Sequence, residues 1–458
     1  KQQSQCTSTN RNNKEEQPFA MASNEASMRR YSQDGIDHGD SQSMTLSMPM
    51  AISAVDISGG TRDSGEALAT ATTDENQFPV AHAEVLLDES VTSLNEMSYK
   101  DIGASFDLFW LPKNQITSLA TSQIQDLKSL GFPAGLAKAM NDNNNKFPMR
   151  VWVVDNSGSM KQDDGCRLVG AKDGVKAVQC TRWMEMQETV QFHAKMASIV
   201  RAPTIFRLLN RPLSKKMRRE FRVESAQELQ MATDLIKRIE PKGCTPLAKR
   251  VWEIRDNIKA LSDQLEERDC RIAVVLATDG LPTNGSGQCT EETKAEFLHA
   301  LKSLEGLPIW LVIRLCTQQQ DVVDFYNDLD AQLELELEVL DDFLSEAREI
   351  YNKNKWINYA LPLHRAREMG FYHRMFDLLD ERMLTLDEVW EYFSFLFGAV
   401  RLKGVPHPTI DFKGFLHASQ RIIQSEPPQY NPIAKKDTPW VDLKKLARTY
   451  KVKKCSIM

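Results

Sequence analysis

Oxygen-bearing side chains stand directly after two apolar stretches of the sequence, and one more lies in a loop between these stretches. Asp155, Ser157 and Ser159 occupy alternate positions directly after one apolar run, Asp279 follows another, and Thr245 lies in a glycine-bounded loop between the two. All five side chains are hard oxygen ligands, which favours Mg²⁺, Ca²⁺ or Mn²⁺ over zinc or copper. With only two carboxylates in the set, and with some of them acting through water, a bound cation would keep net positive character and attract an acidic group from elsewhere.

The elements that must position these side chains alternate along residues 148–350. Near-continuous apolar runs predict buried strands, and apolar residues at three- and four-residue spacing predict helices. The predicted strands are 149–154, 204–209, 220–224, 271–277, 308–313 and 333–340, and the predicted helices include 181–200, 290–304 and 320–329. This order is typical of an α/β fold with a doubly wound, mostly parallel sheet covered by helices on both faces. Because ligands of such sheets bind beyond the carboxyl ends of the strands, the five side chains are expected to converge.

The motifs that carry these side chains are similar to those of a known family. Asp-x-Ser-x-Ser after a first strand, Gly-x-Thr-Pro around Thr245, and Thr-Asp-Gly after a later strand resemble the metal-ion-dependent adhesion site of von Willebrand factor type A (vWA) domains. The resemblance covers about 148–350 and implies a Rossmann-like vWA domain. It further implies that Ser157, Ser159 and Thr245 contact the metal, that Asp155 and Asp279 hold it directly or through water, and that a partner's Asp or Glu completes the shell.

A plainer interpretation of the same residues is that Asp155 and Asp279 only cap helix N-termini while the hydroxyls bond to loop backbone. Capping alone does not require oxygen-bearing residues on three loops in this order. The sequence departs from the family pattern at 161–180, where a Lys172-Asp-Gly174 turn between alternating apolar residues predicts a β-hairpin. Such a hairpin would select the partner or shield the site. Asp163 and Asp164 would either add to the surroundings of the metal or form a solvated turn.

Composition and missing motifs favour a binding protein over an enzyme. The chain carries 57 basic and 63 acidic residues, so its net charge of -6 directs it to no nucleic acid. Its 8 cysteines stand singly, which indicates reduced thiols in the cytosol. No apolar run approaches the roughly 18 residues of a membrane span. Phosphate-loop, nucleophile-elbow and zinc-helix motifs are lacking, and His193 is expected to be a core or surface histidine.

The segment before the predicted sheet divides into two parts. Residues 1–100 are rich in polar residues and poor in aromatic ones, which predicts a disordered arm. Residues 101–147 are interpreted as a helical brace packed on the next domain. The Gly131-Phe132 turn between its helices resembles ubiquitin-associated modules. A ubiquitin-pathway scaffold that combines this turn with the sheet domain is therefore the alternative hypothesis.

The segment after the sheet is predicted to be a helical extension at 351–402, a proline-rich linker at 403–438 and a basic amphipathic tail at 439–458. The tail ends in Cys455-Ser-Ile-Met458, which resembles a prenylation box of the farnesyl type. Basic residues precede this cysteine: Lys444, Lys445, Arg448, Lys451, Lys453 and Lys454. A prenyl group and a polybasic segment together supply the two signals of a stable anchor on an anionic membrane. The bland alternative is an unmodified basic tail.

Together these features predict a metal-dependent protein-binding adaptor. It would use Mg²⁺, or Ca²⁺ or Mn²⁺ in its place, to bind an acidic group of a protein partner at the cytosolic face of a membrane.

Overall fold

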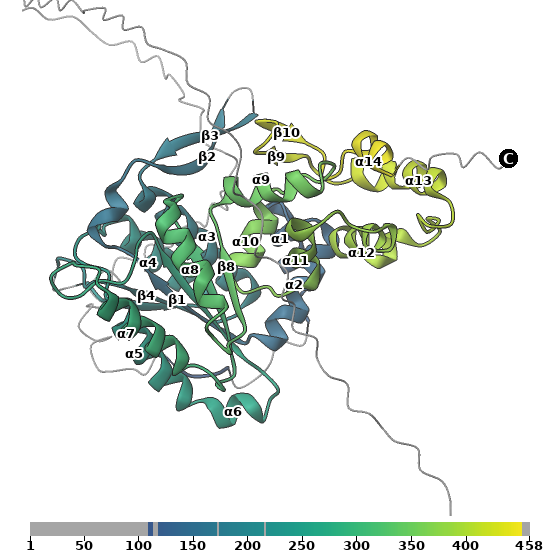
Figure 1. Ribbon diagram of the computed structural model, residues 1–458. Helices are drawn as coiled ribbons and strands as arrows, with labels where there is room; N and C mark the ends of the chain where they lie inside the picture. The colour runs from purple at the N-terminus through teal and green to yellow at the C-terminus, as the bar shows by residue number, and fades with distance from the viewer. Residues whose placement is uncertain (1–108, 113–117, 172–173, 215–216, 451–458) are drawn as a thin grey trace, which may run out of the picture. The chain divides into compact units, whose positions relative to one another are not determined.

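A mostly parallel sheet forms the centre of the computed structural model, which describes residues 109–112, 118–171, 174–214 and 217–450 (Figure 1). All of these residues lie within the unit that spans residues 73–458. In the described part of the chain this sheet has six strands in the order β5-β4-β1-β6-β7-β8. Their bounds are β1 Met149–Val154, β4 Thr204–Leu208, β5 Glu220–Val223, β6 Ile272–Thr278, β7 Ile309–Leu315 and β8 Leu337–Leu340. Only β5 runs antiparallel to its neighbour among these strands.

The strand order confirms the predicted fold class and places a switch point at the centre of the sheet. From β1 the chain moves to β4 on one side, and from β6 it moves to β7 on the other. The winding direction therefore reverses between β1 and β6, which pair in parallel from Met149 with Ile272 to Val154 with Ala277. The carboxyl ends of these strands are where a doubly wound sheet binds its ligands.

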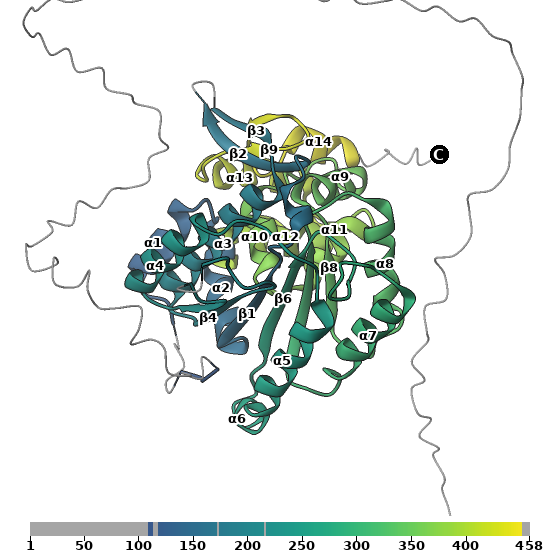
Figure 2. The same cartoon turned by 90° about the vertical axis from the view of Figure 1, so that its left-hand side faces the viewer.

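Helices cover both faces of this sheet (Figure 2). Val151 and Val153 of β1 point to one face, where they join the core formed with α5, α7 and α8, whereas Trp152 and Val154 point to the other face and join α3 and α4. The covering helices are α3 Arg182–Val200, α4 Ala226–Lys237, α5 Leu247–Lys259, α7 Glu291–Lys302 and α8 Gln320–Asp330, and the short α6 Ser262–Glu266 follows α5. Every residue of β1 is buried, Arg150 included, as the near-continuous apolar run predicts.

The segments before and after the sheet share another apolar core. It contains residues of α1 Thr121–Ser129, α2 Ala134–Lys146, α9 Phe343–Lys353, α10 Leu361–Glu368, α11 Arg374–Glu381, α12 Leu386–Phe397, α13 Phe412–Gln424 and α14 Leu443–Thr449. Helix α2 packs closely on the end of α12 at Gly135, where an added Cβ would lie 2.3 Å from the backbone nitrogen of Gly398 and 2.5 Å from the carbonyl oxygen of Phe395. A glycine is needed there because no side chain fits between the two backbones.

The stretch 403–438 is not the linker that its prolines suggested. It contains helix α13 and a hairpin of β9 Gln429–Asn431 and β10 Lys436–Thr438. Phe415, Ile422 and Ile423 of α13 are buried in the core shared by α1, α2 and α9 to α14, and these helices with the β9/β10 hairpin are called the helical region below. The prolines lie outside these helical and strand residues, in the connecting turns, so they bound the elements instead of preventing them.

The turn at Gly131 and Phe132 is packed inside the protein. Phe132 is 1 % exposed, and its ring stacks on Phe192 of α3 at a centroid distance of 6.4 Å. An added Cβ at Gly131 would lie 2.9 Å from the side chain of Gln429. Because Phe132 is covered by its own chain, it is not available to contact ubiquitin in this conformation, and the alternative hypothesis loses its contact residue.

The basic tail begins with a helix that is packed on the rest of the chain. Leu446 of α14 is fully buried, and Leu443 and Tyr450 pack against the same core, while Lys444 and Arg448 are exposed. No helix in the described ranges is long and apolar enough to cross a bilayer. The predicted disordered arm at 1–100 and the residues Lys451, Lys453, Lys454 and Cys455 lie outside the described part of the chain.

Candidate metal centre

The loop after β1 is fixed by its own carboxylate. One oxygen of Asp155, Oδ1, accepts a hydrogen bond from the backbone N–H of Ser157 at 2.8 Å. The other oxygen, Oδ2, accepts from the hydroxyl of Thr278, the last residue of β6, at 2.7 Å. Asp155 is fully buried. The first residue of the motif is thus held against the end of the neighbouring strand.

A chain of hydroxyls connects this loop to Asp279. The Oγ atoms of Ser157 and Ser159 are 2.9 Å apart, and the Ser159 hydroxyl donates to Oδ1 of Asp279 at 2.9 Å. Asp279 is 1 % exposed, whereas Ser159 is half-buried. Four of the five predicted side chains therefore form one connected cluster at the switch point, open to solvent on the Ser159 side.

The loop that carries Thr245 lies beside this cluster. The backbone N–H of Gly158 donates to the carbonyl of Gly243 at 3.0 Å, and the N–H of Thr245 donates to the hydroxyl of Thr283 at 2.8 Å. Thr245 is 6 % exposed, and its own hydroxyl makes no hydrogen bond to any described residue. That hydroxyl is consequently free to serve as a ligand.

Glycine and asparagine explain why the Thr245 loop takes this path. Gly243 has a φ of 103°, a conformation that strains other residues, and an added Cβ would lie 2.9 Å from the side chain of Asn210. The Asn210 side chain donates to the carbonyl of Cys244 at 2.7 Å, and its backbone N–H donates to Oδ1 of Asn156 at 2.7 Å. Asn156 and Asn210 thus join the loops that follow β1, β4 and α4.

Arg182 is a site residue that the sequence did not reveal. Its Nη1 donates to Oδ2 of Asp279 at 2.9 Å, and its Nε and Nη2 donate to the two oxygens of Asp164 at 2.6 and 2.5 Å. The Arg182 side chain is only 1 % exposed. Asp164 therefore acts as the anchor of this arginine, a role that neither expectation for it had included.

The predicted hairpin explains how Asp164 and Arg182 meet. It is confirmed as β2 Gly165–Ala171 and β3 Gly174–Cys180, paired antiparallel with Gly165 opposite Cys180. The residues just before and just after a hairpin are neighbours by construction, which brings Asp164 close to the first residue of α3. An acidic residue before a predicted hairpin and an arginine after it were thus the sequence signal that could have predicted this ion pair.

Because the carboxylates of this cluster are buried, a nearby positive charge would stabilise their ionised form. Burial, followed by the nearby charge of Asp279, raises the pKa of Asp155 to about 7. Hydrogen bonds from Arg182 lower the pKa of Asp164. In the described ranges no group of three or more His, Cys, Asp or Glu side chains is placed to hold a metal ion. The candidate set differs from such groups because hydroxyls supply three of its five members, a donor chemistry that fits a hard cation.

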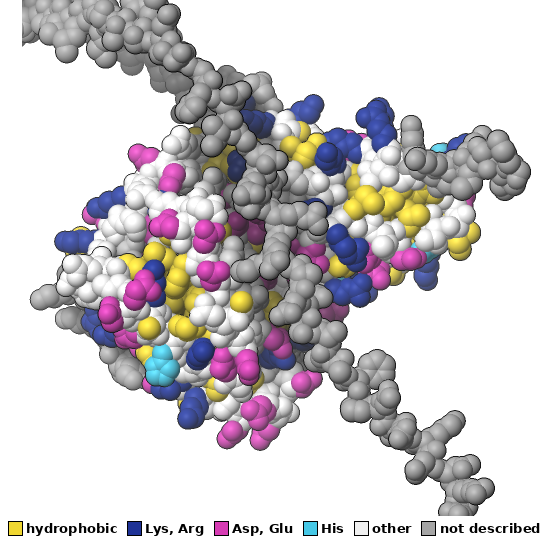
Figure 3. Space-filling model, in the orientation of Figure 1, with side chains coloured by type: hydrophobic (Ala, Val, Ile, Leu, Met, Phe, Trp, Pro, Cys, Tyr) yellow, Lys and Arg dark blue, Asp and Glu magenta, His cyan; other side chains and the backbone are white. Residues whose placement is uncertain are grey.

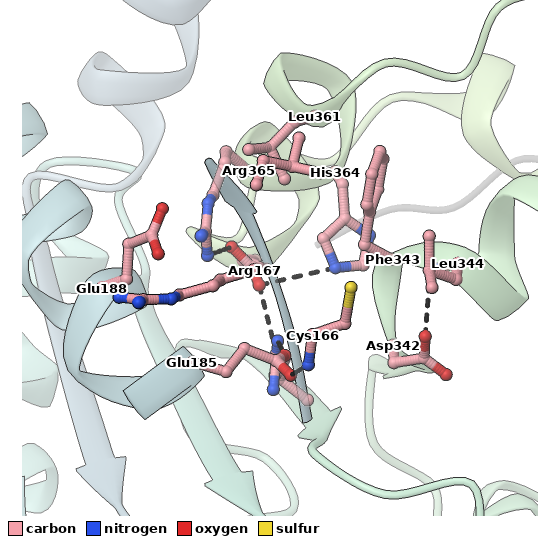
Figure 4. Close-up of a pocket in the computed structure, with 13 residues that line it drawn as sticks. Cys166, Arg167, Glu185, Glu188, Asp342, Phe343, Leu344, Leu361, His364 and Arg365 are labelled. Atoms are coloured by element: carbon pink, nitrogen blue, oxygen red, sulfur yellow. Dashed lines mark hydrogen bonds and ion pairs between the residues drawn. The ribbon is translucent and has the colours of Figure 1, made fainter. Parts of the chain in front are cut away.

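A second buried cluster of charges ties the helical region to the sheet. Glu368 of α10 is fully buried, and His193 of α3 contacts it through Nε2 at 3.0 Å. His193 is 2 % exposed, so it is a core histidine, and burial lowers its pKa to about 4. His364 and Arg365 of α10 and Glu185 of α3 line a cavity of about 30 Å³. Figure 4 shows the two α10 side chains on one side of it and Glu185 on the other.

Comparisons with known proteins place the chain in no family. No family model and no curated protein matches the sequence. The solved structures that resemble part of this chain include the following two. An aspartate-to-alanine mutant of the PilB minor pilin from Streptococcus sanguinis has 13% identity and a TM-score of 0.29, with 42% of this chain and 57% of that chain covered. A von Willebrand factor type A structure from Catenulispora acidiphila has 12% identity and a TM-score of 0.27, with 43% and 39% covered. Likenesses this weak establish neither family nor function.

Proposed function

We propose that this protein is a metal-dependent protein-binding adaptor with a vWA-type site. Asp155, Ser157, Ser159, Thr245 and Asp279 would hold one Mg²⁺, or Ca²⁺ or Mn²⁺ in its place, and an Asp or Glu of a protein partner would complete the shell. The observation that carries the proposal is the connected cluster of buried oxygens at the switch point of the sheet. Hydroxyl ligands add no charge, and a carboxylate that acts through water offsets the charge of the metal only in part, so the metal would keep positive character toward an acid.

Calorimetric titration of the full chain with MgCl₂ tests this proposal. We expect saturable binding at one site, weakened about tenfold, or about 1.4 kcal/mol, in Thr245→Val. Valine keeps the shape of threonine, and the lost hydroxyl makes no hydrogen bond to a described residue, so the midpoint of thermal unfolding without metal should stay unchanged. A wild-type chain that takes up none of Mg²⁺, Mn²⁺ and Ca²⁺ would refute the proposal, and unaltered affinity in the variant would remove Thr245 from the ligand set.

We further propose that the tail anchors this adaptor to the cytosolic face of a membrane, by prenylation of Cys455 together with Lys444, Lys445, Arg448, Lys451, Lys453 and Lys454. The exposure of Lys444 and Arg448 on α14 supports the electrostatic part of this proposal. In eukaryotic cells the wild-type chain should fractionate with membranes and Cys455→Ser should become cytosolic. Equal cytosolic fractions of the two forms would contradict the anchor without touching the metal proposal.

A further inference from the structure

A groove of about 580 Å³ lies in the helical region, away from the candidate metal centre. It is bounded by α13, by the β9/β10 hairpin and by the start of α14. Apolar side chains that line it include Ile357, Ile423, Val441 and Leu443. Its volume is within the range of sites that bind small amphiphilic molecules.

Lysines from separate segments surround this groove. Lys355 precedes the core residue Trp356, Lys436 opens β10, and Lys444 and Lys445 belong to α14. Lys355, Lys436 and Lys444 are exposed, and none of the three forms an ion pair with a described carboxylate. Lys445 lies 3.9 Å from Asp442. Figure 3 shows Lys and Arg side chains beside a hydrophobic patch over the region of α12 to α14. The groove thus combines an apolar lining with a positive rim.

Asn358, which also lines this groove, carries a buried acceptor. This residue is 3 % exposed, and its Nδ2 donates to the carbonyls of Gln429 at 3.1 Å and Thr438 at 3.4 Å. Those two carbonyls fix which end of the amide is the nitrogen. Its Oδ1 has no hydrogen-bond partner among the described residues. A buried acceptor of this kind calls for a donor, which a hydroxyl group can supply.

We infer that this groove binds the headgroup of a phosphoinositide in a membrane. The lysines would contact phosphate, a ring hydroxyl would donate to Oδ1 of Asn358, and the apolar lining would contact the glycerol end of the lipid. Charge complementarity selects an anionic ligand, and the unpartnered acceptor selects one that carries hydroxyls. The inference rests on the proposed membrane anchor, because α14 both lines the groove and leads to Cys455.

Vesicle co-sedimentation of the full chain, made in bacteria and therefore not prenylated, tests this inference. The probes are phosphatidylcholine vesicles with phosphatidylinositol bisphosphate, and vesicles of equal surface charge with phosphatidylserine. Lys355→Glu/Lys436→Glu is compared with Lys259→Glu/Lys302→Glu, which makes the same charge change at exposed positions of α5 and α7. We expect tighter binding to the phosphoinositide vesicles, at least tenfold weaker binding in the groove variant, and a change below twofold in the control.

Equal loss in both variants would overturn the groove as the binding site, because net charge alone would then explain binding. Equal binding of wild type to the two kinds of vesicle would overturn the headgroup assignment. The assignment would also fail if soluble inositol phosphate bound and vesicles did not compete with it. It would fail again if an acidic peptide bound and neither kind of vesicle did. Since this protein carries no prenyl group, these outcomes are independent of the Cys455→Ser result in cells.

Discussion

Replacing Glu368 with leucine is expected to destabilise the folded chain by about 3–5 kcal/mol. The carboxylate of Glu368 accepts hydrogen bonds from Nη1 of Arg365 at 2.8 Å and from Nε of Arg314 at 3.1 Å, all within a fully buried environment. Burial alone would raise the pKa of Glu368, but Arg365 and His364 outweigh it and hold the pKa well below its usual range. Its removal would leave buried guanidinium groups without their counter-charge.

Urea unfolding followed by circular dichroism measures this effect, with Glu291→Leu as the matched control. Glu291 pairs with Lys294 at 2.9 Å on the surface of α7, and such exposed pairs contribute little to stability because water screens them. The control should therefore unfold at nearly the wild-type urea concentration. If Glu368→Leu did so as well, the buried ion cluster would be irrelevant to stability.

The same cluster decides how residues 351–402 relate to the sheet. Arg314 belongs to β7 and His193 to α3, whereas Glu368 belongs to α10. The Arg314–Glu368 ion pair and the His193–Glu368 hydrogen bond therefore join the helical region to the sheet and its covering helix. The side chain of Arg150 in β1 adds a hydrogen bond from its Nε to the carbonyl of Met369 at 3.0 Å. These contacts should make the two regions unfold in one transition, so a single transition is the expected form of the urea curve.

Local pattern was enough to predict the central strands and the carboxylates at their ends. The apolar run at 149–154 coincides with β1, and the run at 271–277 differs from β6 by one residue at each end. Such runs are informative because a parallel strand is covered on both faces and is therefore rich in apolar residues. Once the strands are known, Asp155 and Asp279 must lie near each other, since β1 and β6 are adjacent.

Features that depend on distant partners could not be predicted in the same way. The alternation at 333–340 predicted a strand longer than β8. Only Leu337–Leu340 pairs with β7, and the extent of this pairing cannot be read from local alternation. Prolines at 403–438 suggested a linker. The burial of α13 could not be predicted from this stretch, because it depends on a core assembled from segments before and after the sheet. Arg182 was missed for a related reason: its role follows from two carboxylates, one of them 97 residues away in sequence.

Arg182 gives the candidate metal centre its sharpest test. Its guanidinium contacts the same carboxylate, Asp279, that is proposed to hold the cation, so its positive charge must oppose metal binding. We expect Arg182→Met to bind Mg²⁺ about 10- to 100-fold more tightly than wild type in a calorimetric titration. The same variant should be less stable without metal, because the buried Asp279 would lack a counter-charge.

Thermal unfolding with and without Mg²⁺ separates this effect from a merely structural one. Mg²⁺ should raise the unfolding midpoint of Arg182→Met by more than it raises that of wild type, since the metal would replace the missing charge. Asp164→Asn is the control: Asp164 is half-exposed, and Arg182 should still pair with Asp279 in that variant. Weaker Mg²⁺ binding in Arg182→Met would instead mean that the arginine holds Asp279 in place for the metal. If Arg182→Met were less stable than wild type and no divalent cation raised its unfolding midpoint, Arg182 itself would be the positive charge that neutralises this cluster of oxygens, and the cluster would bind no metal.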